Sequence, residues 1–148
     1  MLQEYKKKRN FNKTQEPQGS GGIKGGGSRI FVAQEHHASH LHWDFRLEYQ
    51  GVLKSWAVPR GIPVKKNDKR LAIEVEDHPL EYGDFAGKIP EGEYGAGVVK
   101  IWDKGKYQLL KKEKDVWEVK LKGKKLKGIY MLFKPARFNK NNWLIIKR

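Results

Sequence analysis

Residues 41–49 read LHWDFRLEY, and apolar and polar side chains alternate along the whole stretch. Because residues two apart in a β-strand point to the same side, the apolar residues would form one face and the polar residues the other. The polar residues are His42, Asp44, Arg46 and Glu48. The Gln50-Gly51 pair predicts a tight turn, and VLKSWAV at 52–58 predicts the returning strand. This stretch therefore predicts a β-hairpin with an apolar core face and a polar face.

Further strands are predicted on both sides of this hairpin. The segments are RIFVAQ at 29–34, LAIEVE at 71–76, VWEVKLKG at 116–123, KGIYMLFKPA at 127–136 and NWLIIKR at 142–148. Residues 98–107, VVKIWD running into DKGKY, predict another hairpin. No convincing helical periodicity is found. About seven or eight short strands separated by turns predict a mainly β chain, an antiparallel barrel or sandwich with long loops and little helix.

The chain divides into two regions. Residues 1–29 predict a flexible basic arm that ends in a glycine-rich linker, GSGGIKGGGS, and this arm is either disordered or a strap laid over the domain. Residues 30–148 predict a single domain. Within it, residues 77–97 form a connection of 21 residues rich in Gly and Pro, and connections this long are often functional. Its GEYGAG segment at 92–97 lacks the lysine of a phosphate-binding P-loop and predicts a tight turn.

Composition narrows the cellular setting and the partner. The 148 residues contain no cysteine, no apolar run long enough for a membrane span, and no secretory signal at the start, which predicts a cytoplasmic protein without a membrane partner. The net charge is +14, and it divides into +5 for residues 1–29, −2 for 30–100 and +11 for 101–148. Two basic ends around a slightly acidic middle favour a polyanion such as nucleic acid.

The opening stretch belongs to a dense cluster of histidines, HHASHLHWDFRLE at 36–48. His42 and Asp44 would lie side by side on the polar face, and a bend could bring His36 over them. Two imidazoles and a carboxylate are a ligand set for Zn, Mn, Fe or Co, and three protein ligands leave positions open for water and substrate. Arg46, next in the row, could hold a phosphate with two donors.

Three other histidines are weaker candidates. His37 is expected to point away from His36, and His40 to be exposed or to support a ligand. His78 ends a predicted strand and opens the long connection, which is a common place for a site residue.

The whole pattern resembles the DNA 3′-phosphoesterase family, the phosphoesterase domain of bacterial DNA ligase D, in its free-standing form. The resemblance rests on QEHHASHLHWDFRLEYQGVLKSWAVPRG, on KRLAIEVEDHPLEYGDFAGKIPEGEYGAG and on the arm YKKKRNFNKTQEP. It implies a β-barrel that binds a divalent metal, manganese above all, with zinc or cobalt as alternatives. It also implies a monomer that acts on DNA or DNA/RNA 3′ ends beside a separate ligase and polymerase of end joining.

The resemblance also implies roles for individual residues. The metal ligands would be His36, His42 and Asp44. The implied residues of the phosphate site and its polar network are Arg46, His78, Tyr82, Arg70 and Gln34. Arg9 and Glu16 in the arm would serve the diesterase step.

The implied reaction has two steps, removal of a 3′-terminal ribonucleoside by phosphodiester cleavage and then hydrolysis of the 3′-phosphate. The family's usual Arg-Asp-Phe reads Arg9-Asn10-Phe11 here, and the missing charge is expected to weaken the diesterase step more than the monoesterase step.

Two other functions are compatible with the same residues. His42, Asp44 and a distant His78 imitate the iron-binding triad of β-barrel oxygenases. A non-catalytic nucleic-acid-binding barrel would use the basic C-terminal third and the aromatic residues, but it gives no reason for the row of His, Asp and Arg.

Overall fold

The computed structural model describes residues 2–19 and 29–148. Within them the chain forms two short helices and nine strands. The elements are α1 (Gln3–Lys7), β1 (Arg29–His37), β2 (Leu41–Tyr49), β3 (Val52–Val58), β4 (Lys69–His78), η1 (Leu80–Asp84), β5 (Gly87–Ile89), β6 (Gly97–Glu113), β7 (Val116–Lys122), β8 (Lys127–Phe133) and β9 (Asn142–Lys147). None of the helices in this part of the chain is long and apolar enough to cross a membrane.

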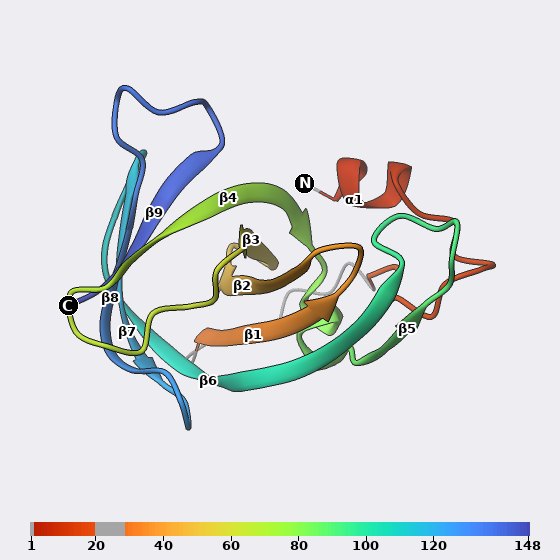
Figure 1. Cartoon of the computed structure of the whole chain (residues 1–148), viewed down its shortest axis with the longest axis horizontal. Coiled ribbons are helices and arrows are strands. Elements are labelled where there is room, and N and C mark those ends of the chain that lie inside the picture. The colour runs from red at the N-terminus through yellow and green to blue at the C-terminus, as the bar shows by residue number, and fades with distance from the viewer. Residues whose placement is uncertain (1, 20–28) are drawn as a thin grey trace.

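Eight of the strands close into an antiparallel barrel, which confirms the predicted fold class (Figure 1). The order is β1-β2-β3-β4-β9-β8-β7-β6, and β6 pairs again with β1 to complete the ring. β5 is a short addition that pairs with the start of β6. The predicted hairpin is β2–β3, in which Tyr49 pairs with Val52 across a two-residue turn. Gln50 and Gly51 both have positive φ there, at 51° and 83°, as such a turn requires.

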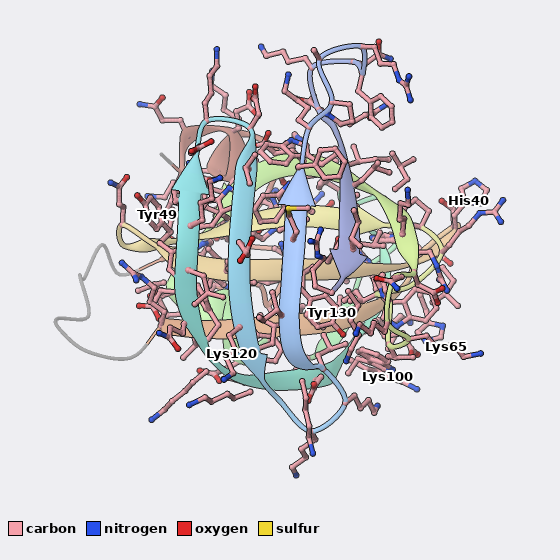
Figure 2. The ribbon with its side chains drawn as sticks, turned by 90° about the vertical axis from the view of Figure 1, so that its left-hand side faces the viewer. His40, Tyr49, Lys65, Lys100, Lys120 and Tyr130 are labelled. Carbon is pink, nitrogen blue, oxygen red and sulfur yellow. The ribbon has the colours of Figure 1, made fainter. Side chains whose placement is uncertain are left out.

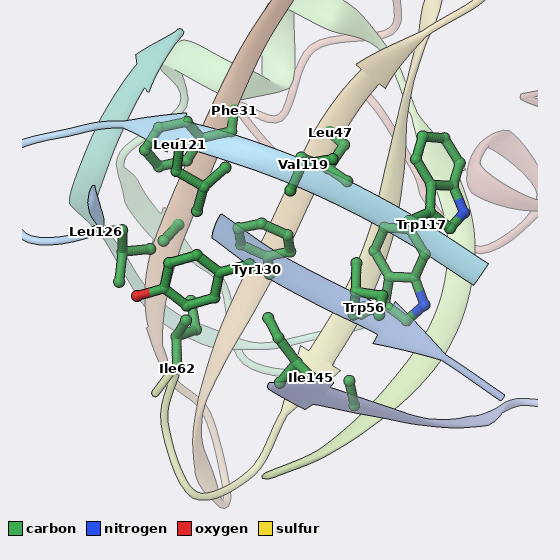
Figure 3. Close-up of a cluster of buried hydrophobic side chains, with 14 of the residues drawn as sticks. Phe31, Leu47, Trp56, Ile62, Trp117, Val119, Leu121, Leu126, Tyr130 and Ile145 are labelled. Carbon is green, nitrogen blue, oxygen red and sulfur yellow. The ribbon is translucent and has the colours of Figure 1, made fainter. Parts of the chain in front are cut away.

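The apolar face of the opening stretch lies inside the barrel (Figure 3). Phe45 and Leu47 are fully buried in a cluster to which all eight ring strands contribute. Trp56 lies in this cluster and makes edge contacts to Trp117 and Trp143, each with ring centroids 5.8 Å apart. Since side chains alternate along each strand, the polar residues between these positions face the outside of the barrel.

The hairpin predicted within residues 98–107 is wrong, because this segment is part of one long strand, β6. Gly105 lies in the middle of this strand. A Cβ atom at this position would lie 2.2 Å from the Lys122 carbonyl oxygen of β7, so the glycine allows close approach of two backbones and makes no turn.

Residues 2–19 pack against the outside of the barrel, as the strap alternative describes, and α1 lies near the end of β4 (Figure 1). Tyr5 is fully buried, and its hydroxyl donates to the Pro17 carbonyl oxygen. It belongs to a second apolar cluster, separate from the barrel interior. The other members are Leu53, Leu80, Tyr82, Phe85, Ile89 and Val99, with Phe11 packed against them. The predicted linker at 20–28 lies outside the described residues.

Candidate active site

A pocket of about 260 Å³ lies on the outer face of β1–β4, beneath the arm and the long connection at 79–96. The strands contribute His36, His42, Asp44, Arg46, Ala57, Val75, Glu76 and His78 to its lining. The arm contributes Arg9 and Glu16, and the connection contributes Tyr82, Ile89, Tyr94 and Gly95. The polar face of the opening stretch is therefore covered by two segments distant in sequence.

Three possible metal ligands converge at one end of this pocket. His36 and His42 are direct cross-strand partners in β1 and β2, and their ring centroids are 4.7 Å apart. Asp44 is two residues from His42 on the same face of β2. Its Oδ2 lies 3.5 Å from His36 Nδ1 and 3.4 Å from His42 Nε2. His36 reaches the others through strand pairing, so no bend is needed.

The remaining nitrogen of each imidazole is occupied by a backbone carbonyl. His36 Nε2 lies 2.7 Å from the Gly95 oxygen, and His42 Nδ1 lies 3.1 Å from the His40 oxygen. A nitrogen bonded to a carbonyl has to carry the proton, so in the neutral ring the other nitrogen presents a lone pair toward Asp44. Metal-binding histidines in proteins are fixed in the same way. Two lone pairs and a carboxylate fit a divalent cation between them.

Electrostatics also favour an ionised carboxylate here. Burial alone would raise the pKa of Asp44, but the charge of the Arg46 guanidinium, followed by the adjacent imidazoles of His36 and His42, holds that pKa well below its usual range. The hydrogen bond with Asp44 in turn raises the pKa of His42 above its ordinary value, although burial opposes this rise. Asp44 is thus a permanent anion, and either a proton on His42 or a bound cation would neutralise it.

Arg46 lies next to the cluster and is 3% exposed. Its Nε donates to Gln34 Oε1 at 2.6 Å, and its Nη2 lies 3.5 Å from Asp44 Oδ2. Gln34 is itself held by bonds from its Nε2 to the carbonyls of Tyr82 and Phe85, so it positions the guanidinium from beneath. The Arg46 Nη1 is buried and has no partner among the described residues. An anion in the pocket would supply one, since a buried unpaired donor is unfavourable by about 1–3 kcal/mol.

His78 enters the pocket from a bulge in β4. Leu53 pairs with His78 and Ser55 with Val75, so β4 carries one extra residue at this point. His78 Nδ1 lies 2.9 Å from the Glu76 carbonyl, which leaves Nε2 as the acceptor 3.5 Å from Arg9 Nη2. Burial, followed by the charges of Arg46 and Arg9, lowers the pKa of His78 well below its ordinary value. The side chain is therefore neutral near pH 7.

The arm brings a buried acid to the opposite side of the pocket. Glu16 is 4% exposed, and it accepts bonds from Arg9 Nε at 2.9 Å, Tyr82 Oη at 2.7 Å and Thr14 Oγ1 at 2.9 Å. Burial, followed by the Glu16 charge, raises the pKa of Tyr82 well above its usual range even though Arg46 opposes the rise, so its hydroxyl stays a donor. The structure thus brings Arg9, Glu16 and Tyr82 together.

Three lining residues that contact other residues of the site were missed by the sequence reasoning, besides the apolar Ala57, Val75 and Ile89. Glu76 accepts from Lys8 at 2.9 Å and from Arg9 at 3.3 Å, which ties the arm to β4. The cationic groups of Lys8 and Arg9 lie over the ring of Tyr94, which belongs to the GEYGAG turn. Gly95 has φ of 76° and supplies the carbonyl that fixes His36. The available signal was the density of glycines in a long connection.

Some predicted residues lie elsewhere. Arg70 is not in the pocket, because it begins β4, eight residues before His78, and donates to the carbonyls of Arg60 and Gly61. His37 and His40 are exposed, and His37 pairs with Glu35. Asn10 is exposed as well, and its Oδ1 accepts from the Asn12 backbone at 3.0 Å in a local turn.

The fold and this site together describe a β-barrel with a candidate cation centre beside a buried guanidinium. A family model for the DNA ligase D 3′-phosphoesterase domain matches residues 34–134. The chain therefore belongs to that family, and the resemblance predicted from the sequence is confirmed.

Curated relatives agree over nearly the whole chain. The Multifunctional non-homologous end joining protein LigD of Pseudomonas aeruginosa is 45% identical over 153 residues, which cover 99% of this chain and 18% of that protein. The Multifunctional non-homologous end joining DNA repair protein LigD of Mycobacterium tuberculosis is 46% identical over 147 residues, covering 97% of this chain and 19% of that protein. The corresponding protein of Mycolicibacterium smegmatis is 44% identical over 154 residues, covering 97% and 20%. The chain thus spans about a fifth of the length of these relatives.

Proposed function

We propose that this chain is a metal-dependent 3′-end-processing phosphoesterase of DNA end joining. It would remove a 3′-terminal ribonucleoside by a phosphodiesterase step and then the 3′-phosphate by a phosphomonoesterase step. Manganese is the proposed metal, with zinc or cobalt as alternatives. The enzyme would act as a monomer in the prokaryotic cytoplasm and hand its 3′-hydroxyl product to a separate polymerase or ligase. Its family membership supports phosphoester hydrolysis, and the relatives' names support the setting of end joining.

The observation that carries this proposal is the convergence of His36 Nδ1, His42 Nε2 and Asp44 Oδ2 next to the unpartnered Nη1 of Arg46. The three ligand atoms lie within 4.8 Å of one another. A divalent ion held there would act as a Lewis acid on a phosphate oxygen and lower the pKa of a bound water. Arg46 offers a donor to another oxygen of the same phosphate, where negative charge grows in the transition state.

His78 would handle the proton of the leaving 3′-oxygen. Because its pKa is well below the ordinary value, its Nε2 begins the reaction as an acceptor. A phosphate dianion bound between Arg46 and Arg9 would offset the two charges that, after burial, lower this pKa. His78 would then hold a proton and could pass it to the departing oxygen. Its bond to the Glu76 carbonyl keeps Nε2 in position throughout.

The arm residues would serve the diester step. Arg9 is held by Glu16 and Glu76, and its Nη2 is the group nearest to His78 Nε2. A phosphodiester carries a second substituent beyond the phosphate, and we propose that it would lie toward Arg9, Glu16 and Tyr94, which also line the pocket. Arg9 and Glu16 are therefore placed to contact the terminal nucleoside, whereas a bare 3′-phosphate needs only Arg46, His78 and the cation.

A single substrate reports on both reaction steps. It is a duplex with one terminal ribonucleotide, labelled in the strand that is processed, and incubated with manganese. Wild-type protein should convert it first to the 3′-phosphate and then to the 3′-hydroxyl. Replacing His42 or Asp44 by Ala should reduce both steps by on the order of 10³-fold or more, because the cation loses one of three ligands. Glu16→Gln should slow the first step more than the second.

His40→Ala is the matched control, since His40 is exposed in the same hairpin (Figure 2) and offers His42 only its backbone carbonyl. Its activity should equal that of the wild type. Full manganese-dependent activity in His42→Ala would refute the ligand assignment.

Two further assays test the other functions. An oxygenase triad would need His78 beside His42 and Asp44, but the cluster found among the described residues contains His36 instead. Iron-dependent consumption of oxygen with an oxo-acid would nevertheless favour that function. Tight binding of DNA in EDTA, with no turnover under any metal, would favour a non-catalytic barrel.

A further inference from the structure

A second charged surface lies on the outer face of β6–β8, away from the pocket. It consists of six exposed lysines, which we call the lysine row. They are Lys106 on β6, Lys120 and Lys122 on β7, Lys124 and Lys125 in the following turn, and Lys127 on β8. Figure 2 looks onto this side of the barrel and labels Lys120. The site described above uses none of these residues.

The strand register places like charges directly opposite one another. Lys106 pairs with Lys122, and Lys122 pairs with Lys127 on its other side. Like charges in directly opposed positions of a sheet are destabilising. Within residues 2–19 and 29–148, no ion pair neutralises any lysine of the row, although Lys104 and Lys111 on β6 have Asp84 and Glu113 as partners. The barrel thus keeps an unfavourable arrangement that an external anion would relieve.

The turn that carries two of these lysines is held rigidly. The buried Asp103 carboxylate accepts from the backbone nitrogens of Lys124, Lys125 and Leu126 at 2.8–3.0 Å. A Cβ at Gly123 would lie 2.3 Å from Asp103 Oδ2, so this glycine allows the turn to dock on the carboxylate. Asp103 therefore bonds to the backbone and not to the lysine side chains. A rigid cationic platform binds with less loss of conformational freedom than a flexible tail.

We infer that the lysine row binds the phosphate backbone of the duplex behind the processed 3′ end, an inference that rests on the proposed function. Duplex DNA carries one charge for about every 1.7 Å of its axis, and lysines bind phosphates as point charges without reading sequence. Single-strand binding would call for exposed aromatic platforms as well. Among the described residues, the exposed large aromatic is Tyr94, which lies at the pocket, while Lys125 covers the ring of Trp102 at 4.7 Å.

The distance between the two surfaces sets the length of DNA that can reach both. β6 connects them, since Val99 on this strand pairs with the ligand His36 and Lys106 lies seven residues further along. At about 3.3 Å per residue the path along the strand is about 23 Å, comparable to the length of about seven base pairs. A shorter stem with its 3′ end in the pocket would not reach the lysine row.

The test compares two triple variants with equal loss of charge. One carries Lys106→Gln, Lys122→Gln and Lys127→Gln. The control carries Lys65→Gln, Lys66→Gln and Lys69→Gln, which are exposed lysines of the β3–β4 loop and the start of β4. Binding of hairpin DNAs with stems of about four and about twelve base pairs is measured by fluorescence anisotropy in EDTA.

The row variant should bind the long stem on the order of tenfold more weakly, and the slope of log affinity against log salt should fall by about 2–3. The short stem, and the control variant with either stem, should change less than about twofold. Equal weakening by both triple variants, or no weakening by the row variant, would overturn the inference. A wild-type protein that bound polyglutamate and not the long stem would show instead that the row serves an acidic protein.

The proposed function is tested apart from this, by manganese-dependent release of phosphate from the short stem with a 3′-phosphate. Wild type and both triple variants should release it equally. Failure of the wild type there would contradict the proposed function and leave the binding comparison in EDTA intact. Because all six substituted lysines are exposed, both triple variants should remain folded. Lys122→Gln alone should weaken binding of the long stem by less than the row variant does.

Discussion

Charged residues are arranged differently on two outer faces of the barrel, that of β1–β4 and that of β6–β8. In the first region the charged groups are buried under the arm and held by named partners, as Glu16 is by Arg9, Tyr82 and Thr14. In the second the lysines are exposed, stand opposite one another and have no ionic partner among the described residues. Buried, fixed groups suit chemistry on one phosphate, whereas exposed, unpaired charges suit contact with many phosphates. The following predictions separate the two regions.

After loss of a metal ligand, the largest effect is expected at Arg46. Arg46→Lys keeps the charge but loses the planar fork, in which Nε bonds to Gln34, Nη2 lies 3.5 Å from Asp44 and Nη1 is buried without a partner among the described residues. Hydrolysis of a 3′-phosphate should fall by about 10²–10³-fold. Arg70→Lys is the control, since Arg70 lies outside the pocket, and it should leave the rate unchanged. Recovery of full activity by Arg46→Lys would show that charge alone matters at this position.

The next effect concerns stability in the covered region. Tyr82→Phe keeps the ring but removes the donor to the Glu16 carboxylate. Because that acceptor is charged, the free energy of unfolding in urea should fall by about 1.5–3 kcal/mol. Tyr107→Phe, which removes a bond to the neutral Glu48 carbonyl, should lose only about 1 kcal/mol. Equal losses would mean that the bond from Tyr82 to Glu16 is no stronger than a bond to a neutral carbonyl.

A pH effect of about 1 kcal/mol is expected from His78. Its pKa in the folded chain is lowered, first by burial, so below its ordinary value of 6.5 the unfolded chain takes up a proton that the folded chain does not. Folding stability from this group is therefore complete above pH 6.5 and is lost as pH falls toward the folded pKa. Without metal, wild-type protein should lose about 1 kcal/mol more than His78→Gln between pH 7.5 and 5.5. The raised pKa of His42 has the opposite effect on stability, but it is the same in wild type and His78→Gln and so cancels in the difference. Identical pH profiles of the two proteins would contradict the prediction.

A smaller effect of opposite sign is expected on the lysine row. Lys122→Gln removes the central charge of three opposed lysines and should raise the free energy of unfolding by about 0.5 kcal/mol at low salt. The gain should fade in high salt, where the charges are screened. Lys66→Gln is the matched control and should change nothing. A destabilised Lys122→Gln would argue against repulsion within the row.

The smallest effect is expected at Asn10. The sequence pattern predicts that the missing aspartate charge weakens the diesterase step, but the Asn10 side chain is exposed and caps a local turn. Aspartate can accept the same hydrogen bond. Asn10→Asp should therefore change both steps by less than about twofold, because the position is exposed and outside the pocket. A large gain in diester cleavage alone would restore the original expectation.

The sequence predicted those parts of the site that depend on strand alternation. His42, Asp44 and Arg46 lie on one face because they are two residues apart in β2. What alternation cannot show is pairing over long distances or a change in register. Val75 and Glu76 are neighbours in sequence and both line the pocket because β4 has a bulge, and Gly95 reaches His36 from a turn 59 residues away. The hairpin predicted within residues 98–107 was wrong for the same reason, since the close backbone of β7 at Gly105 is invisible in the surrounding sequence.

The central claim is that His36, His42 and Asp44 hold one divalent cation. The most direct test is a crystal soaked in manganese, with the anomalous signal of that metal located. If these three residues bind one cation, one strong peak is expected about 2.0–2.3 Å from His36 Nδ1, His42 Nε2 and an Asp44 oxygen, next to Arg46. A peak between His42 and His78, or the three ligand atoms apart with no peak among them, would contradict it.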